Sequence, residues 1–147
     1  MSRVLILFMF LSFVCSAQET KEYADVISVN VSGDHNSYTF SVGIASPDTG
    51  CSQYANWWEV ISEDGQLVYR RILGHSHVEE QPFVRSGGKV RIGEAQMVII
   101  RAHMNTSGYG GAQYRGSVKA GFEKISESKD FAKYLEKESP QPSGCAF

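Results

Sequence analysis

The residues best suited to chemistry lie close together in the segment GHSHVEEQPFVRS, from Gly74 to Ser86. This segment combines two imidazoles with carboxylates, an amide and a guanidinium: His75, His77, Glu79, Glu80, Gln81 and Arg85. Neutral imidazole nitrogens are good ligands for zinc and copper, and a nearby carboxylate can complete the ligand shell. The alternative is a pair of loop histidines that bond to backbone carbonyls and to the two glutamates, because a short His-x-His motif has little specificity.

A third histidine, His103, lies at the end of the most apolar segment, Gln96–His103. If the strand before His75 continues, His75 and His77 project from one face, because residues two apart in a strand point the same way. The three imidazoles would then form a site for Zn or Cu, with Asp48 or one of the glutamates as a further ligand. We therefore predict His75, His77 and His103 as metal ligands.

Around this segment we predict a polar binding patch. Its members carry charged, amide or phenolic groups: Asp48, Tyr54, Glu80, Gln81, Arg85, Arg101 and Tyr109. Arg101 lies in an apolar strand, and a buried guanidinium needs a carboxylate or carbonyl partner, for which Glu59 and the two glutamates of the segment are candidates. An outward-facing position on the strand is the alternative for Arg101.

Known catalytic motifs do not account for these residues. Asp48-Thr49-Gly50 matches the active-site triplet of aspartic proteases, but Ser46-Pro47 precede it instead of an apolar strand, and those enzymes need two such aspartates. We read it as a loop. The sequence has no nucleophile elbow and no P-loop, so we assign no catalytic residue.

The segments that must position these groups are predicted to form β-strands. Apolar residues alternate with polar ones at Ile27, Val29 and Val31, and again through residues 38–44, with the turn GDHN between the two runs. Asp64-Gly65 joins residues 56–62 to 66–73 as a hairpin turn. Further short strands are expected at residues 86–94, 96–103 and 114–122.

About seven strands without an intervening helix predict an immunoglobulin-like antiparallel β-sandwich, with a small closed barrel as the alternative. Trp57 and Trp58 should point to opposite faces, one into the core and one toward an edge or the surface. The charged segment 126–138 predicts a short amphipathic C-terminal helix. We therefore divide the chain into residues 1–17, 18–124 and 125–147: a signal peptide, the sandwich, and a helix with a tail.

The N-terminus predicts export. Arg3 precedes an apolar run, Val4–Val14, and Cys15-Ser16-Ala17 supply small residues for cleavage, as in a secretory signal peptide. Lipidation of Cys15 is the alternative, which we disfavour because the bulky Val14 precedes the cysteine. The run is too short for a good membrane span, so the mature chain is expected to have no transmembrane segment and to be periplasmic or secreted.

Net charge and cysteine content bear on the partners of the protein and on its disulfide bonding. Removal of 17 from 147 residues leaves 130, with 13 basic residues (14 less Arg3) against 16 acidic ones, a net charge of −3. A mildly acidic domain argues against nucleic acid as a partner. Cys51 and Cys145 remain, and in an oxidising compartment they are expected to form a disulfide; unpaired thiols or pairing between chains are the alternatives.

Three stretches together resemble a known family: DTGCSQYANWWEV, EDGQLVYRRILGHSHVEEQPFVRS and VIIRAHMNTSGYGG, within Asp48 to Gly111. The family consists of small exported, mostly bacterial proteins with no assigned activity. The resemblance implies that the His-x-His segment is a family hallmark. This chain departs from the pattern at Ser76, where the family has proline, and at Ser107, where it often has histidine. A metal site that needs a histidine at 107 would be incomplete here unless His103 replaces it.

These observations predict an exported, non-enzymatic binding domain. Its ligand would be a divalent metal, Zn or Cu, or an unidentified envelope or extracellular partner. One alternative is a metal-assisted hydrolase in which Glu79 or Glu80 acts as base toward a zinc-bound water. The other is a purely structural envelope module.

Overall fold

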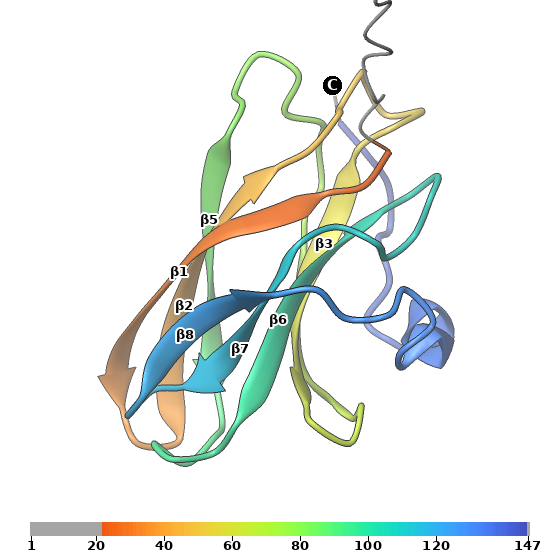
Figure 1. Cartoon of the computed structure of the whole chain (residues 1–147). Helices are drawn as coiled ribbons and strands as arrows, with labels where there is room; N and C mark the ends of the chain where they lie inside the picture. The colour runs from red at the N-terminus through yellow and green to blue at the C-terminus, as the bar shows by residue number, and fades with distance from the viewer. Residues whose placement is uncertain (1–21, 147) are drawn as a thin grey trace, which may run out of the picture.

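The computed structural model describes residues 22–146, which form a sandwich of two antiparallel sheets (Figure 1). One sheet has the order β1-β2-β5 and the other β4-β3-β6-β7-β8. The strands are β1 (Asp25–Asp34), β2 (Ser37–Ala45), β3 (Ala55–Ser62), β4 (Leu67–Ile72), β5 (Phe83–Val90), β6 (Val98–Met104), β7 (Gln113–Ser117) and β8 (Gly121–Ile125). The predicted antiparallel sandwich is confirmed. The expected strand at 114–122 is a hairpin, β7–β8, and this gives eight strands instead of seven.

Alternation along the strands builds the core between the sheets. The apolar residues of β2, from Tyr38 to Ile44, face inward as predicted, and Trp58 of β3 is fully buried against them. In β1, the register shifts between Val26 and Ser28, so that Val26 is buried and Ile27 is 41% exposed. The prediction that Ile27 faces the core was wrong, because a β-bulge reverses the side-chain alternation locally.

Strand β3 is buried on both faces, and this differs from the expectation that one tryptophan lies near the surface. Trp57 and Trp58 are 2% and 0% exposed. Trp58 belongs to the core between the sheets, whereas Trp57 lies on the outer face of the five-stranded sheet. That outer face is covered by the C-terminal tail, residues 126–146, which packs Leu135 against Ile61 and Ile99.

The tail contains a five-residue 3₁₀ helix, η1 (Lys133–Lys137), in place of the predicted helix over 126–138. Ala132 has φ of 48°, a left-handed conformation that an α-helix cannot contain. The carbonyls of Phe131, Ala132 and Leu135 accept hydrogen bonds from arginine side chains. Tertiary contacts therefore replace the backbone ladder that the amphipathic pattern predicts.

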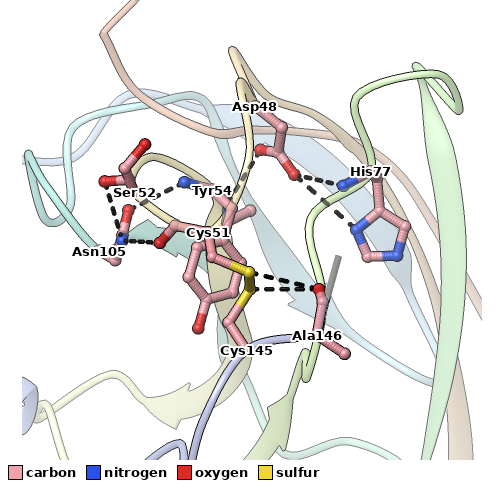
Figure 2. The surroundings of a disulfide bond; sticks show 9 residues. Asp48, Cys51, Ser52, Tyr54, His77, Asn105, Cys145 and Ala146 are labelled. Atoms are coloured by element: carbon pink, nitrogen blue, oxygen red, sulfur yellow. Dashed lines mark hydrogen bonds and ion pairs between the residues drawn. A yellow bond between two sulfur atoms is a disulfide. The ribbon is translucent and has the colours of Figure 1, made fainter.

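The Cys51–Cys145 disulfide is formed, as predicted, and joins the loop after β2 to the end of the tail across 94 residues of sequence (Figure 2). Next to it, the Ala146 amide donates to the Gly74 carbonyl at 2.8 Å. Between residues 22 and 146, the helical segments are too short or too polar to cross a membrane. The expected signal peptide, including Cys15, lies outside the described residues.

Gly116 is required by the close approach of β7 and β8. A Cβ at this position would lie 2.0 Å from the Gly121 carbonyl oxygen, whereas a Cβ at Gly74 would meet nothing within 4 Å. Gly116→Ala should therefore lower the free energy of unfolding by about 1–3 kcal/mol through overpacking. Gly74→Ala, the matched control, should leave it nearly unchanged. Urea denaturation of both variants checks this, and equal stabilities would contradict so close an approach of the two strands.

Candidate functional site

The structure separates the predicted patch into two groups and places Tyr54 apart from both, beside the disulfide (Figure 2). The first is the polar loop, residues 74–86, with Asp48 beneath it. The second is the tail-covered face, which we define as the outer surface of β3, β4 and β6 under the tail. It contains Arg101 and His103 together with residues that the sequence analysis did not assign to the patch: Asn56, Trp57, Glu59 and Arg70. Tyr109 of the loop after β6 and Glu136 of the tail lie against this face.

Asp48 holds the polar loop on the sandwich. Its Oδ1 accepts hydrogen bonds from the Ser46 hydroxyl at 2.7 Å and the Ala55 amide at 2.9 Å. Its Oδ2 accepts from the His77 amide at 2.8 Å (Figure 2). The carboxylate is buried and both of its oxygens accept hydrogen bonds from within the chain. Asp48 therefore acts as a structural anchor.

Gln81 fixes the other end of the same loop. Its Nε2 donates to the Ser46 hydroxyl at 3.2 Å and the His77 carbonyl at 3.1 Å, while its Oε1 accepts from the Ser46 amide at 2.9 Å. Glu80 and Arg85 form an ion pair at the surface, 2.7 Å between Oε2 and Nη2, which lowers the pKa of Glu80 and raises that of Arg85. An ion pair so exposed contributes little to stability.

His77 is packed as an aromatic side chain. Its ring stacks on Phe83 with 3.8 Å between centroids, and it is 3% exposed. Neither ring nitrogen has a hydrogen-bond partner among the described residues, and the nearest oxygen of Asp48 is 3.8 Å from Nδ1. Burial, with smaller effects of Arg85 and His75, lowers the pKa of His77 to about 4, so the ring is neutral at pH 7. His75 is exposed, with its ring 4.3 Å from that of His77.

The three-histidine metal site is not formed. Within residues 22–146, no group of three or more His, Cys, Asp or Glu side chains is placed to hold a metal ion. His75 and His77 line a pocket of the polar loop, whereas His103 lines a different pocket beside the tail. β4 ends at Ile72, so the strand that was expected to carry the first two histidines does not reach them.

A buried carboxylate organises the tail-covered face. Glu59 of β3 lies directly across from Arg70 of β4 and Arg101 of β6. Arg70 Nε donates to Glu59 Oε2 and Arg101 Nε donates to Glu59 Oε1, each at 2.8 Å, and the three side chains are at most 1% exposed. Of the three carboxylates considered as partners for a buried Arg101, namely Glu59, Glu79 and Glu80, the structure places Glu59 against it. Arg101 also points outward from the sandwich, as the alternative had it, but the tail buries it.

The remaining guanidinium N–H groups donate to backbone carbonyls of the tail. Arg101 bonds to the carbonyls of Phe131 at 2.6 Å and Ala132 at 3.1 Å. Arg70 bonds to three more, those of Leu135 at 2.6 Å, Glu138 at 2.6 Å and Pro140 at 3.1 Å. The tail is therefore held through its main chain by two arginines whose own charge is balanced in part by one carboxylate.

Aromatic rings fill the space around these charges. The Arg70 guanidinium lies 4.3 Å from the Trp57 ring centroid, and Arg101 lies 3.5 Å from that of Tyr109. Burial and the Glu59 carboxylate raise the pKa of Tyr109, so its phenol is neutral. Tyr54 lies instead beside the disulfide, where burial and Asp48 raise its pKa (Figure 2). Tyr54 and Tyr109 are both buried, with 5% and 2% of their surfaces exposed.

His103 is the titratable group of this face that reaches a pocket. It stacks on Trp57 with 3.8 Å between ring centroids, and its Nδ1 is 2.7 Å from Asn56 Oδ1. Burial, Arg70 and Arg101 lower the pKa of His103 to about 3, so the ring is neutral. Because an amide oxygen only accepts, Nδ1 carries the proton and Nε2 carries the lone pair.

The lone pair of His103 faces a second acceptor. Nε2 is 3.6 Å from Oε1 of Glu136 in η1, and the two side chains are 8% and 26% exposed. Both line a cavity of about 290 Å³ that also includes Ser107, Gly108 and Lys133. Two acceptors that face each other repel unless a proton, a water hydrogen or a cation lies between them, and burial lowers the pKa of the imidazole. This pair is therefore the candidate cation site.

Comparison with known proteins yields a partial match to a curated relative. The chain is 37% identical over 90 residues to a protein named "Putative lipoprotein" from Halomicrobium mukohataei, a halophilic archaeon. The match covers 60% of this chain and 44% of the relative, so the chain spans less than half of that protein. No family model and no solved structure matches the chain. The archaeal source does not bear out the expected, mostly bacterial distribution, while the relative's name and the disulfide fit an exported protein.

Glu59 can be tested by removing its charge. Glu59→Gln leaves two buried guanidiniums without a counterion and should lower the free energy of unfolding by about 3 kcal/mol or more. The matched control is Glu63→Gln, whose ion pair with Arg115 is about half exposed at the surface and should contribute about 1 kcal/mol or less. Chemical denaturation of both variants measures the difference, and similar losses would refute a central role for Glu59.

Because His77 is buried as a neutral ring, we predict that the stability of the fold depends on pH. Because its pKa is lower in the folded protein than the ordinary 6.5, the unfolded chain takes up the proton first as the pH falls. The stability that neutral His77 contributes is therefore complete above pH 6.5 and is lost between 6.5 and about 4, by at most about 1.4 kcal/mol per pH unit. His77→Phe keeps the stack on Phe83 and removes this titration.

We expect His77→Phe to be at least as stable as the wild type at pH 7 and to gain relative to it at pH 4.5. Urea denaturation at both pH values checks this. A large loss of stability at pH 7 would show that the ring nitrogens make bonds that the fold requires.

Proposed function

We propose that the mature chain is an exported, non-enzymatic domain that binds a divalent transition-metal ion, Zn²⁺ or Cu²⁺, between His103 and Glu136. The observation that carries this proposal is the 3.6 Å separation of His103 Nε2 and Glu136 Oε1, two acceptor atoms that share one cavity. Imidazole nitrogen with carboxylate oxygen is a donor set suited to zinc and copper.

The separation fits a bound ion. With metal–ligand distances of about 2.0–2.2 Å, a tetrahedral ion holds two ligand atoms roughly 3.4 Å apart. The pair in this protein is 3.6 Å apart, so a small side-chain shift suffices. Asn56 accepts the Nδ1 proton of His103 and so orients the ring, as second-shell groups commonly do for histidine ligands of metals.

Two protein ligands leave open positions on the ion, which water would occupy within the cavity. This makes the proposed site a weaker one than closed structural zinc sites, which have four protein ligands. Ser107 lines the same cavity at a position where a longer side chain could reach the ion. The proposed site can therefore be tested by adding a ligand side chain as well as by removing one.

The location of the protein is part of the proposal. The expected signal peptide, the disulfide and the name of the archaeal relative support export. In a periplasmic or secreted protein, the site would meet metal ions of the outer medium.

A metal-assisted hydrolase is less well supported by the geometry. The carboxylates expected to act as base, Glu79 and Glu80, line the polar-loop pocket and not the cavity of His103. Glu80 is also paired with Arg85, which holds its pKa low and makes it a weak base.

Calorimetric titration of the purified mature domain with Zn²⁺ and with Cu²⁺ tests the proposal. Glu136→Gln, a partly exposed change with little risk to folding, should weaken binding roughly tenfold or more, as should His103→Ala. His35→Ala removes a histidine of the turn between β1 and β2 and should have no effect. The proposal fails if the wild type binds neither ion, or if the loss follows His75→Ala and spares Glu136→Gln.

Ser107→His provides the test by addition. An imidazole at 107 would supply a third ligand in the cavity of His103 and Glu136, and should raise zinc affinity roughly tenfold or more. Asn30→His, on exposed β1, is the control for a histidine that binds metal alone. Equal affinity in the two variants would mean that the cavity does not hold the ion.

A further inference from the structure

The proposed ligand Glu136 belongs to a segment in which Leu135 packs on the sandwich and Tyr134 Oη donates to the Gly65 carbonyl. Two further attachments lie on either side of Glu136. The first is the pair of arginines, and Arg70 in particular bonds to the carbonyls of Leu135 and Glu138 on either side of Glu136. The second is the Cys51–Cys145 disulfide, nine residues beyond Glu136. The sandwich side of the cavity, in contrast, is part of β6 and the loop after it.

The tail has little structure of its own to hold Glu136 in place. Its one helical element is the five-residue η1, preceded by the left-handed Ala132. Leu135 is the one fully buried apolar side chain of η1. A single 3₁₀ turn is marginal in isolation, so its position depends on the attachments at its two sides.

We propose that the Cys51–Cys145 disulfide is a redox latch for the His103–Glu136 metal site. This inference rests on the proposed function. While the bond is intact, the end of the tail cannot leave the loop after β2, and Glu136 stays opposite His103. When the bond is reduced, the arginine bonds, the buried Leu135 and the hydrogen bonds of Tyr134 and Ala146 remain, but the covalent tie is gone. The metal-binding carboxylate then leaves the site for part of the time.

The chemical step is a thiol–disulfide exchange with a dithiol reductant. One thiolate of the reductant attacks a sulfur of the Cys51–Cys145 bond and forms a mixed disulfide, and its second thiol then displaces that bond. The protein gains two electrons and two protons as two thiols, and the reductant becomes a disulfide. Cys51 and Cys145 are both partly exposed, so a reductant can reach the bond.

Linkage makes the latch reciprocal. If reduction of the disulfide weakens metal binding by some factor, a bound metal must make the disulfide harder to reduce by the same factor. The tail transmits both effects, because docking of the tail brings Glu136 to His103 and Cys145 to Cys51. The cavity would therefore report the redox state of the compartment through its metal content.

The test compares zinc affinity in the oxidised wild type and in Cys51→Ser/Cys145→Ser. Serine is used because free thiolates would themselves bind zinc. We expect the double variant to bind zinc roughly tenfold more weakly, a typical coupling factor. Amide hydrogen exchange of residues 133–138 should be faster in this variant and should slow again when zinc is added. Gly116→Ala, which destabilises the β7–β8 hairpin and leaves the disulfide intact, is the control for lost stability and should keep the wild-type affinity.

The possible outcomes distinguish a failure of the redox latch from a failure of the metal site. Weaker binding with faster exchange in the tail supports the latch. Equal affinity in the wild type and the double-serine variant overturns the latch and leaves the metal site standing. An oxidised wild type that does not bind zinc ends the proposed function, and the latch with it.

Discussion

The carboxylate of Glu59, placed between two buried guanidiniums, is the interaction on which the rest of this structure depends. It lies at the centre of a sheet face that a sandwich of this kind would otherwise expose to water. One carboxylate cannot satisfy the ten N–H groups of two arginines, five each. The carbonyls of the tail accept several of those that remain. The buried charge cluster thus needs further hydrogen-bond acceptors, and the backbone carbonyls of the tail supply them.

Burial of this outer sheet face explains several features that are otherwise unrelated. Trp57 is buried on the outer face because Arg70, His103 and Tyr109 pack against it. The pKa of His103 falls because burial and the two arginines disfavour its charge. A neutral, oriented imidazole then faces Glu136, which only the tail can bring there. The candidate metal site therefore exists because the tail packs over the charged face of the sheet.

Local periodicity was sufficient to predict the sandwich, the hairpin turns and the core face of β2, because strand alternation and turn residues act over a few positions. It failed at Ile27, where one extra residue in a bulge reverses the alternation. It also failed for the tail, whose helix pattern is overridden by arginines that lie more than 30 residues away in sequence. The disulfide was predicted from compartment and cysteine count. The grouping of His103 with Glu136, rather than with His75 and His77, depends on tertiary contacts that spacing alone does not encode. A charged triplet in register across β3, β4 and β6, namely Glu59, Arg70 and Arg101, was the one available signal for the covered face.

The sealed sheet face and its tail together create the proposed metal site between His103 and Glu136. The most direct measurement of that site is an anomalous-scattering crystal structure of the oxidised mature domain grown with zinc. We predict one zinc ion at about 2.0–2.2 Å from both His103 Nε2 and a carboxylate oxygen of Glu136. A zinc ion bound at His75 and His77, or a His103–Glu136 cavity that stays free of zinc at saturating concentration, would contradict this prediction.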